Sequence, residues 1–201
     1  MTFTDEFFLS RMHGAIMPST GCTEPVAIAL NTATARANAK GEVLSLTLTL
    51  DNYLYKNAMG VGIPGADERG VALCAAMGVT AGDATANMRV LDHVTPQALA
   101  QAKAMVPNVH VRTREDVHGL LVESVLETTV RVDHAPFEAY MESEEGDAYA
   151  DDPIRNCRLE DMIDFARRVP LTELMFLQEG IDMNLDVARE GMEFGLGLAV
   201  R

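Results

Sequence analysis

The sequence of 201 residues lacks the features that mark several classes of protein. It has 16 Lys and Arg against 30 Asp and Glu, a formal net charge of −14, and the basic residues are scattered rather than gathered in a stripe. Such a surface repels phosphate backbones and anionic lipid, so we expect neither nucleic-acid binding nor membrane attachment. No apolar run approaches the roughly 18 residues that a membrane-spanning helix needs.

Cysteine is scarce, with three residues at positions 22, 74 and 157. An odd number of well-separated cysteines does not make a disulfide framework, which favours reduced thiols in a cytoplasm. The N-terminus has neither the basic start nor the sustained apolar segment of a signal peptide. The sequence also contains no CxxC, CxxH or HxxxH spacing, so neighbouring side chains do not form a self-contained zinc or iron–sulfur site.

Apolar residues make up 48% of the chain, which predicts a globular fold. Their spacing indicates the α+β class, with a mixed or antiparallel sheet, packed helices and a helical C-terminal segment. Along the chain, we expect helices at 4–16, 23–40, 71–78, 95–106, 158–169 and 171–194. We expect a strand at 42–56 and antiparallel strands joined by short turns at 108–115, 118–127 and 128–143.

The acidic stretch at 142–153 is the best candidate for a linker. We therefore divide the chain into an α+β domain over 1–145 and, over 146–201, this linker and the start of a helical domain. The last residues, "GLGLAVR", follow a long predicted helix without a polar tail, so we expect a missing C-terminal domain or subunit as a partner. The apolar helices at 160–195 also favour a homo-oligomer.

The motif "PSTGCTEP" at 18–25 places a cysteine among polar residues at the start of a predicted helix. Thr23 is the expected N-cap, and the positive end of the helix dipole would lower the pKa of the Cys22 thiol. Such a thiol can be a nucleophile, a proton acceptor or a metal ligand, with Glu24 as a second participant or an ordinary first-turn acid. The alternative is a small residue that fills a turn beside Gly21, and local sequence leaves both interpretations open.

The glycine-rich segment "MGVGIPGADERG" at 59–70 is the second candidate site. Three of its glycines permit positive φ angles and a close approach of a ligand to the backbone, namely Gly60, Gly62 and Gly65. The segment is neither a P-loop nor a dinucleotide fingerprint, and an ordinary turn is the alternative. Lys56 and Asn57, just before it, could bind a carboxylate or form a solvated strand end.

The remaining cysteines and histidines favour structural roles. Cys74 lies in the apolar segment "VALCAAMG" and is expected in the core, and Cys157 is an ordinary thiol near a helix start. The five histidines are dispersed and are expected at the surface or on strands, at positions 13, 93, 110, 118 and 134.

Two segments, "GCTEPVAIA" and "NYLYKNAMGVGIPG", resemble the L-cysteine desulfidase family, which is related to the iron–sulfur L-serine dehydratases. The later "FLQEGIDMNLDVAREGMEFGLGLAV" and, in outline, the β-rich middle resemble it as well, so the resemblance spans nearly the whole chain. It implies a lyase that eliminates the β-substituent of an L-amino acid. L-Cysteine would give pyruvate, ammonia and sulfide, or L-serine would give pyruvate and ammonia.

The resemblance also implies roles for individual residues. Laid on the "PSSSHT" motif of the dehydratases, "PSTGCT" puts Cys22 at the position of a histidine that is a candidate base for the Cα proton. Cys22 would then be the catalytic base, or a ligand to the cluster or the substrate. The substrate-binding set comprises Ser19, Thr20, Gly21, Thr23 and Glu24, together with Lys56, Asn57, Gly60, Gly62 and Gly65.

Members of that family resemble the dehydratases in using a [4Fe–4S] cluster as a Lewis acid on the leaving group. Its ligands are expected in a second, helical part, in "GMICDGAK"-like surroundings, and no such segment occurs in this chain. We therefore expect the cluster ligands mainly outside the chain, which by itself should be inactive. Two other classes stay open: a non-catalytic amino-acid-binding or regulatory module, because a helix N-terminus binds carboxylates without reacting, and an assembly domain.

Overall fold

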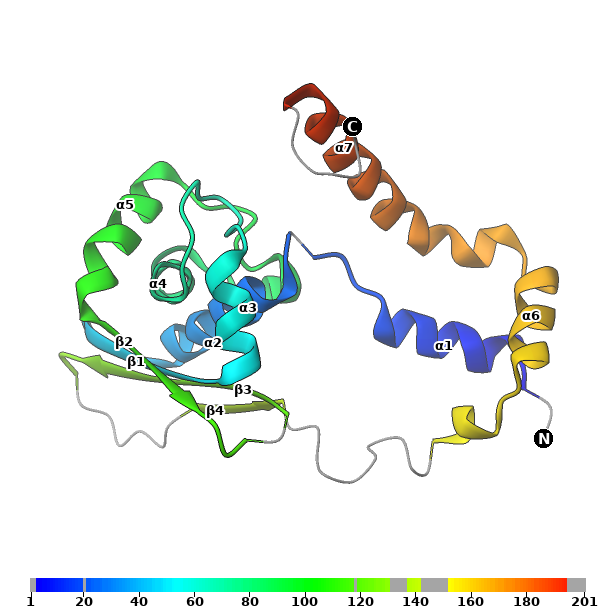
Figure 1. The fold of residues 1–201 in the computed structure, drawn as a ribbon, viewed down its shortest axis with the longest axis horizontal. Coiled ribbons are helices and arrows are strands. Elements are labelled where there is room, and N and C mark those ends of the chain that lie inside the picture. Colours follow the sequence, from blue (N-terminus) through cyan, green and yellow to red (C-terminus); the bar gives the residue numbers. More distant parts are fainter. Residues whose placement is uncertain (1–2, 20, 118, 131–136, 142–151, 195–201) are drawn as a thin grey trace. The chain divides into compact units, whose positions relative to one another are not determined.

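The computed structural model describes residues 3–19, 21–117, 119–130, 137–141 and 152–194. The chain forms two compact units, one of residues 19–150 and one of residues 1–18 with 151–201. The first, which we call the sheet unit, combines a mixed sheet with helices, and the second, the helical unit, contains helices in its described part (Figure 1). The predicted α+β class with a helical C-terminal segment is confirmed.

The sheet has four strands in the order β2-β1-β3-β4, with the bounds Val109–Arg114, Val43–Asp51, Leu120–Thr128 and Phe137–Met141. β2 pairs with β1 in parallel, whereas β3 is antiparallel to both β1 and β4. Leu46, Leu48 and Leu50 alternate along β1 and are fully buried in the core. An alternation of this kind gives a strand one apolar face that helices can cover.

The expected pairing between the segments 108–115 and 118–127 is wrong. The two segments, β2 and β3, lie on opposite sides of β1 instead. β1 has three fully buried leucines and lies inside the sheet, where both neighbouring strands form hydrogen bonds with its backbone. The last predicted strand, 128–143, corresponds to the final residue of β3 and to β4 among the described residues. The linker expected at 142–153 lies outside the described residues except for its last two positions.

The predicted strand at 42–56 ends at Asp51, and the chain turns directly into helix α3, Asn52–Gly60. The buried Asp51 carboxylate causes this change, because its Oδ1 accepts hydrogen bonds from the backbone N–H groups of Tyr53 and Leu54, both at 2.9 Å. Its Oδ2 accepts a third, from the N–H of Leu121 on β3 at 2.8 Å. One side chain therefore joins the end of β1, the start of α3 and the start of β3.

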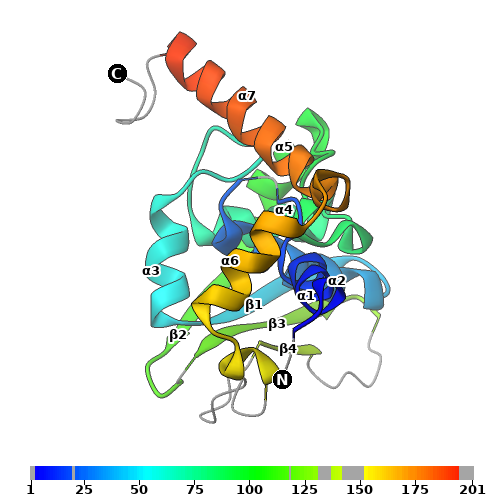
Figure 2. The ribbon, with the colours of Figure 1, turned by 90° about the vertical axis from the view of Figure 1, so that its right-hand side faces the viewer.

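The other helices of the sheet unit are α2 (Thr23–Asn38), α4 (Val71–Ala81), η1 (Ala84–Arg89), α5 (Pro96–Met105) and η2 (Val106–Asn108). The α-helices lie together on one side of the four strands (Figures 1 and 2). α2 and α4 approach closely at Gly78, where an added Cβ would lie 2.0 Å from Thr32 Oγ1 and 2.4 Å from the carbonyl oxygen of Ala29. This contact fixes α2, whose first residues carry the cysteine motif.

The helical unit contains α1 (Asp5–Ala15), η3 (Pro153–Asn156), α6 (Leu159–Arg168), η4 (Leu171–Leu177) and α7 (Gln178–Phe194). Its core is aromatic: Phe8 and Phe165 stack with ring centroids 4.7 Å apart, and Phe3 and Val169 are buried with them. Ion pairs join Arg11 to Asp152 and Arg168 to Asp5. Residues 3–18 therefore pack with the C-terminal helices, whereas the sequence division places them with the α+β domain.

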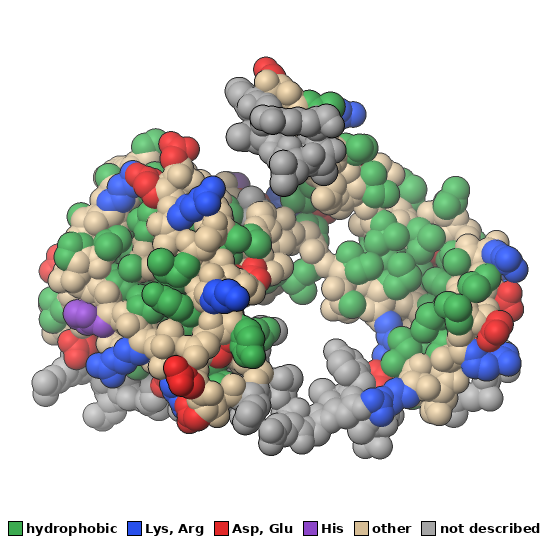
Figure 3. Space-filling model, viewed as in Figure 1, with side chains coloured by type: hydrophobic (Ala, Val, Ile, Leu, Met, Phe, Trp, Pro, Cys, Tyr) green, Lys and Arg blue, Asp and Glu red, His purple; other side chains and the backbone are tan. Residues whose placement is uncertain are grey.

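Several large apolar side chains of the helical unit are exposed (Figure 3). Leu171 is 80% exposed and Val187 68%, both within the segment 160–195 that was expected to be apolar, and Leu159, just before that segment, is 69% exposed. Within the described residues, no helix combines the length and the apolar character needed to cross a membrane. The terminal segment 195–201, on which the expected continuation depends, lies outside the described residues.

Candidate functional site

Cys22 is itself the N-cap of α2, and Thr23 is the first helical residue rather than the cap. The thiol makes no capping hydrogen bond to the helix backbone. Sulfur is a weak acceptor, and the Cys22 thiol instead donates to Oε2 of Glu24, with Sγ and Oε2 3.2 Å apart. The cysteine is therefore an exposed proton donor paired with a carboxylate.

The Glu24 carboxylate is the centre of a small polar cluster. Its Oε2 accepts hydrogen bonds from Cys22 Sγ and Thr23 Oγ1, both at 3.2 Å, and its Oε1 accepts one from Asn57 Nδ2 of α3 at 3.3 Å. The structure thus brings together four residues of the predicted set, three from the start of α2 and one from α3. We call them the thiol–carboxylate cluster.

The Glu24 carboxylate raises the pKa of the Cys22 thiol above its ordinary value, because it accepts the hydrogen bond of the thiol. Partial burial and the negative charge act in the same direction, and the backbone N–H groups of Thr23 and Glu24 oppose them. The expectation of a lowered thiol pKa is therefore wrong, since an adjacent carboxylate outweighs the helix end. The hydrogen bond from Cys22 in turn lowers the pKa of Glu24, so near neutral pH a neutral thiol faces an ionised carboxylate.

The substitution Glu24→Gln removes the charge beside the thiol and is expected to lower the pKa of Cys22. Alkylation by iodoacetamide near pH 8 should then be faster by roughly three- to tenfold, because the thiolate is the reacting form. Site-resolved mass spectrometry over a range of pH measures the rate at each cysteine. Cys74 is the internal control: burial raises its pKa to about 12, and its thiol donates to the carbonyl oxygen of Pro25 at 2.9 Å. Equal rates at Cys22 in both proteins would contradict control by Glu24.

The glycine-rich loop is shorter than predicted, and its first and last residues are in contact. Gly60 is the last residue of α3, and its carbonyl oxygen accepts a hydrogen bond from Arg69 Nη1 at 2.9 Å. Gly62 forms an isolated antiparallel bridge with Arg69. Of the three glycines that would permit a positive φ, Gly65 alone adopts one, at 79°. At Gly65 an added Cβ would lie 2.8 Å from Val94 Cβ, which holds the loop against the segment after η1.

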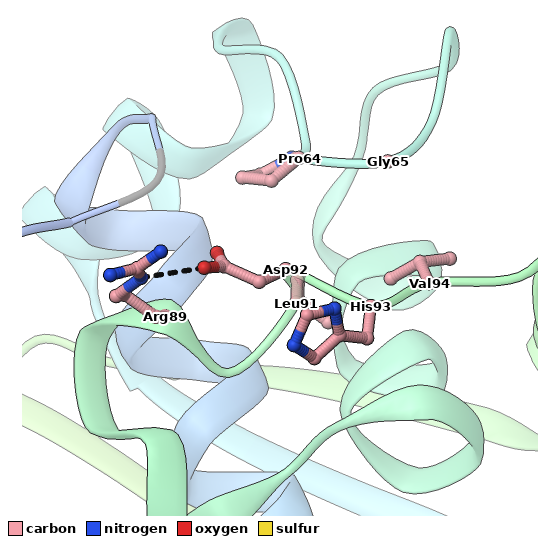
Figure 4. A pocket seen from close by; sticks show the side chains of 7 residues that line it. All are labelled: Pro64, Gly65, Arg89, Leu91, Asp92, His93 and Val94. Carbon is pink, nitrogen blue, oxygen red and sulfur yellow. Dashed lines mark hydrogen bonds and ion pairs between the residues drawn. The ribbon is translucent and has the colours of Figure 1, made fainter. Parts of the chain in front are cut away.

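A pocket of about 500 Å³ lies where this loop meets the segment after η1 (Figure 4). Pro64 and Gly65 border it on one side, and Arg89, Asp92 and His93 border it on the other. Arg89 Nε and Asp92 Oδ2 form an ion pair at 2.6 Å. The pocket was missed in the sequence, although three ionisable side chains within the five residues "RVLDH" were a signal that could have found it.

In its described residues, the segment that leads into α2 lies beside this pocket. Gly21 has a φ of 86°, and an added Cβ would lie 3.1 Å from Pro64 Cγ. Ser19 Oγ donates to the carbonyl oxygen of Met88 at 3.5 Å, one residue before Arg89. Two further members of the predicted set are therefore next to the pocket. Thr20, between them, lies outside the described residues.

Lys56 is separated from the thiol–carboxylate cluster. It lines a different pocket of about 340 Å³ together with Tyr53 and Arg114, while Asn57 hydrogen-bonds to Glu24. Successive residues of a helix point in different directions, so the two neighbours on α3 do not form the joint carboxylate site that the sequence suggests.

Among known proteins, several curated ones resemble this chain over most of its length. No family model matches the chain, and no solved structure does. The curated proteins that resemble it include one of Photobacterium profundum, 32% identical over 96% of this chain, and one of Shewanella oneidensis, 30% identical over 96%. A third, of Clostridium tetani, is 28% identical over 92%. All three are named UPF0597 proteins. The chain is similar to UPF0597 proteins.

The chain spans about half the length of these UPF0597 relatives, 50%, 50% and 48% respectively. The name UPF0597 states no activity, so the resemblance to the L-cysteine desulfidases stays a prediction. Within the described residues, no group of three or more His, Cys, Asp or Glu side chains could hold a metal ion. Cys74 is buried and its thiol donates to the carbonyl oxygen of Pro25, so the described residues do not fit a [4Fe–4S] cluster.

Proposed function

We propose that this chain supplies the amino-acid-binding and proton-transfer residues of a lyase that eliminates the β-substituent of L-cysteine or L-serine. One observation carries the proposal: the Cys22 thiol and the Glu24 carboxylate share a hydrogen bond of 3.2 Å at the start of α2. The residues of this pair lie in the segment that resembles the desulfidases, and Asn57 of the second resembling segment holds the same carboxylate.

The pair can perform the proton transfers of a β-elimination. When Cys22 passes its proton to Glu24, the sulfur becomes a base. The raised pKa of Cys22 and the lowered pKa of Glu24 make this transfer uphill, so the reactive thiolate is a minor form of the pair. The Cα proton of the substrate moves to the sulfur, the electrons of the C–H bond form the Cα=Cβ bond, and the β-substituent leaves with its bonding electrons and the proton from Glu24. The resulting aminoacrylate tautomerises, and water hydrolyses the imine to pyruvate and ammonia.

The test measures proton abstraction separately from elimination. L-Cysteine or L-serine is incubated with the chain in D2O, alone and with a polypeptide that supplies the rest of the relatives' length, while NMR follows loss of the Cα proton and a coupled assay follows pyruvate. A general base contributes typically 10²- to 10⁴-fold, so Cys22→Ser should slow Cα–H exchange by at least about 100-fold. Glu24→Gln should instead slow pyruvate formation by about tenfold or more, because the amide cannot give a proton to the leaving group.

The matched control is Cys157→Ser, which removes a thiol of the helical unit and should leave the exchange rate unchanged. Exchange in Cys22→Ser at the rate of the unsubstituted chain would overturn the assignment of Cys22 as the base. Exchange without pyruvate would restrict the chain to the proton-transfer half of the reaction.

A second candidate function is an amino-acid-binding module that does not react. The raised pKa of Cys22 favours it, because a thiol that is protonated near neutral pH reacts slowly. Calorimetry with L-cysteine and L-serine distinguishes the two: submillimolar binding without any Cα–H exchange would support the module.

We also propose a cytoplasmic location and a further protein segment or subunit as a partner. All three cysteines are free thiols, in keeping with a reducing compartment. The chain spans half the length of its relatives, and the exposed apolar side chains of the helical unit, among them Leu159 and Leu171, offer a surface for such a segment.

A further inference from the structure

We propose that helix α7, Gln178–Phe194, is a docking helix, and that the part of the UPF0597 relatives that this chain does not cover encloses it on most of its sides. The partner is the further protein segment proposed above, so the docking of α7 rests on that proposal and adds the place where the segment binds. A segment that fits α7 has an apolar groove that wraps around a helix.

The charged residues of α7 all lie on one side of the helix. At 3.6 residues per turn they occupy about 100° of its circumference, and over about 200° on the other side the residues are apolar or glycine, with Asn184 as the exception. A helix at the surface of a globular protein typically buries one apolar stripe, and a helix that is apolar all round is buried. α7 lies between these two cases, so a larger body should cover more than one of its sides. The charged side comprises Glu179, Asp182, Asp186, Arg189, Glu190 and Glu193.

The apolar side of α7 is uncovered in the described part of the chain. Ile181, Leu185, Val187 and Met192 are between 47% and 68% exposed, and none of the described side chains over 178–193 is buried. A helix that packs on nothing is only marginally stable in water, because most helical stability in proteins comes from packing of an apolar face. α7, coloured orange in Figure 1, therefore has the face that packing requires without a partner among the described residues.

Two glycines on the same side of α7 indicate how closely the partner approaches. Gly180 and Gly191 are about three turns apart and lie nearly in line along the helix. Glycine inside a helix is less favourable than alanine, and an added Cβ at Gly180 would meet nothing within 4 Å. Contacts within the described residues therefore do not favour glycine at this position. A second backbone lying close against this side would favour it, because glycine has no side chain to keep the two apart.

The length of the relatives and the width of the apolar side favour this segment over a second copy of the chain. The Photobacterium profundum relative matches 96% of this chain, but the match covers 50% of the relative, which leaves a further part of similar length. Pairing of α7 with α7 of a second copy would cover one stripe and leave much of the apolar side in water. The net charge of −14 on each copy also opposes self-association.

A chimera tests the docking of α7 in a protein of the relatives' length. In it, this chain replaces the matching half of the Photobacterium profundum relative, and amide hydrogen exchange followed by mass spectrometry compares α7 in the chimera with α7 in the chain alone. The amides of α7 should exchange at least about 100-fold more slowly in the chimera, because a packed helix opens far less often than one without a partner. Equal exchange of α7 in the two proteins would overturn the proposal.

Two substitutions on opposite sides of α7 test which side is covered. Leu185→Ser in the chimera should remove most of the protection, since it places a hydroxyl in the middle of the apolar side. Glu190→Ser is the matched control on the charged side and should leave the protection in place. If Leu185→Ser is not folded by circular dichroism, Leu185→Ala replaces it, with an expected loss of protection of about tenfold or more. Unchanged protection in the Leu185 variant would overturn the proposal.

Further measurements separate the possible partners. If the chimera itself is not folded, the two parts are coexpressed as separate chains and compared in the same way. Light scattering of the chain alone at micromolar concentration should show a monomer. A dimer that Leu185→Ser dissociates would assign α7 to a second copy and overturn the proposal.

The outcomes also distinguish the docking of α7 from the proposed function. Protection of α6 and η4 in the chimera, without protection of α7, would keep the proposed partner and remove α7 as its binding site. Protection of α7 in a chimera that neither exchanges the Cα proton nor forms pyruvate would keep the docking and remove the proposed reaction.

Discussion

Replacement of Gly78 by alanine is expected to lower the free energy of unfolding by about 2–3 kcal/mol, although alanine is the better helix former. The added Cβ would lie 2.0 Å from Thr32 Oγ1 and 2.4 Å from the carbonyl oxygen of Ala29. Thr32 is fully buried and its hydroxyl donates to the carbonyl oxygens of Ile28 and Ala29, both at 3.2 Å, so it has no room to turn aside. The two helices must move apart, and dense interiors resist such shifts.

Denaturant unfolding followed by circular dichroism measures the effect. Gly180→Ala is the matched control, because Gly180 also lies within a helix but an added Cβ there would meet nothing within 4 Å. That variant should keep or raise stability, by up to about 1 kcal/mol. If Gly78→Ala proved as stable as the control, α2 and α4 would not be in the contact described. Because α2 carries Cys22, the shift should also change the alkylation rate of that thiol.

Replacement of Asp51 by alanine is expected to cost about 3–5 kcal/mol, the second large effect. The side chain is 1% exposed and accepts three backbone hydrogen bonds, from Tyr53, Leu54 and Leu121. Without it, buried N–H groups are left unpaired, and each costs about 1–3 kcal/mol. Asp51→Asn should cost less, about 2 kcal/mol, because one oxygen remains for the helix start while the new amide group faces the N–H of Leu121.

The same unfolding measurement applies, together with amide hydrogen exchange at Leu121. Thr95→Ala is the comparison, since Thr95 caps α5 through one exposed hydrogen bond to Ala98 N at 3.2 Å and its loss should cost about 1 kcal/mol. An Asp51→Ala protein that loses no more than this control would show that Asp51 acts as an ordinary cap and not as a link between β1, α3 and β3.

Helices with local signals were predictable, and pairings that depend on distant residues were not. Pro96 marks the start of α5 as the sequence indicates, because proline favours the first turn of a helix. Asp51 was also a local signal, but the large apolar or aromatic residues Tyr53, Leu54 and Tyr55 follow it closely and concealed the cap. The parallel pairing of β1 with β2 follows from the burial of Leu46, Leu48 and Leu50 on packing, which no local pattern contains.

In the candidate site, too, the local arrangement of residues was predictable and the arrangement that depends on the fold was not. Cys22 and Glu24 are two residues apart, and their proximity was evident from the sequence. The sign of the pKa shift at Cys22 was not, because it depends on whether the carboxylate points at the thiol or away from it. The Arg89–Asp92 pair was overlooked because charged side chains three residues apart are common on solvated surfaces, and only the fold turns the loop of Pro64 toward them.

The parallel neighbours β1 and β2 have a consequence for the time at which the site forms. The whole connection between them contains α3, the loop at 61–70 and η1, and with these Asn57, Arg89 and Asp92. Two parallel strands can pair only after the long crossover between them has become compact. Contacts between residues so far apart in the sequence make folding slow. Helix α2, with Cys22 at its start, can therefore form early in folding. The residues of the crossover that lie next to it, such as Asn57, take their positions when β2 pairs with β1. Competence to bind a ligand should be among the last properties that a newly made chain acquires.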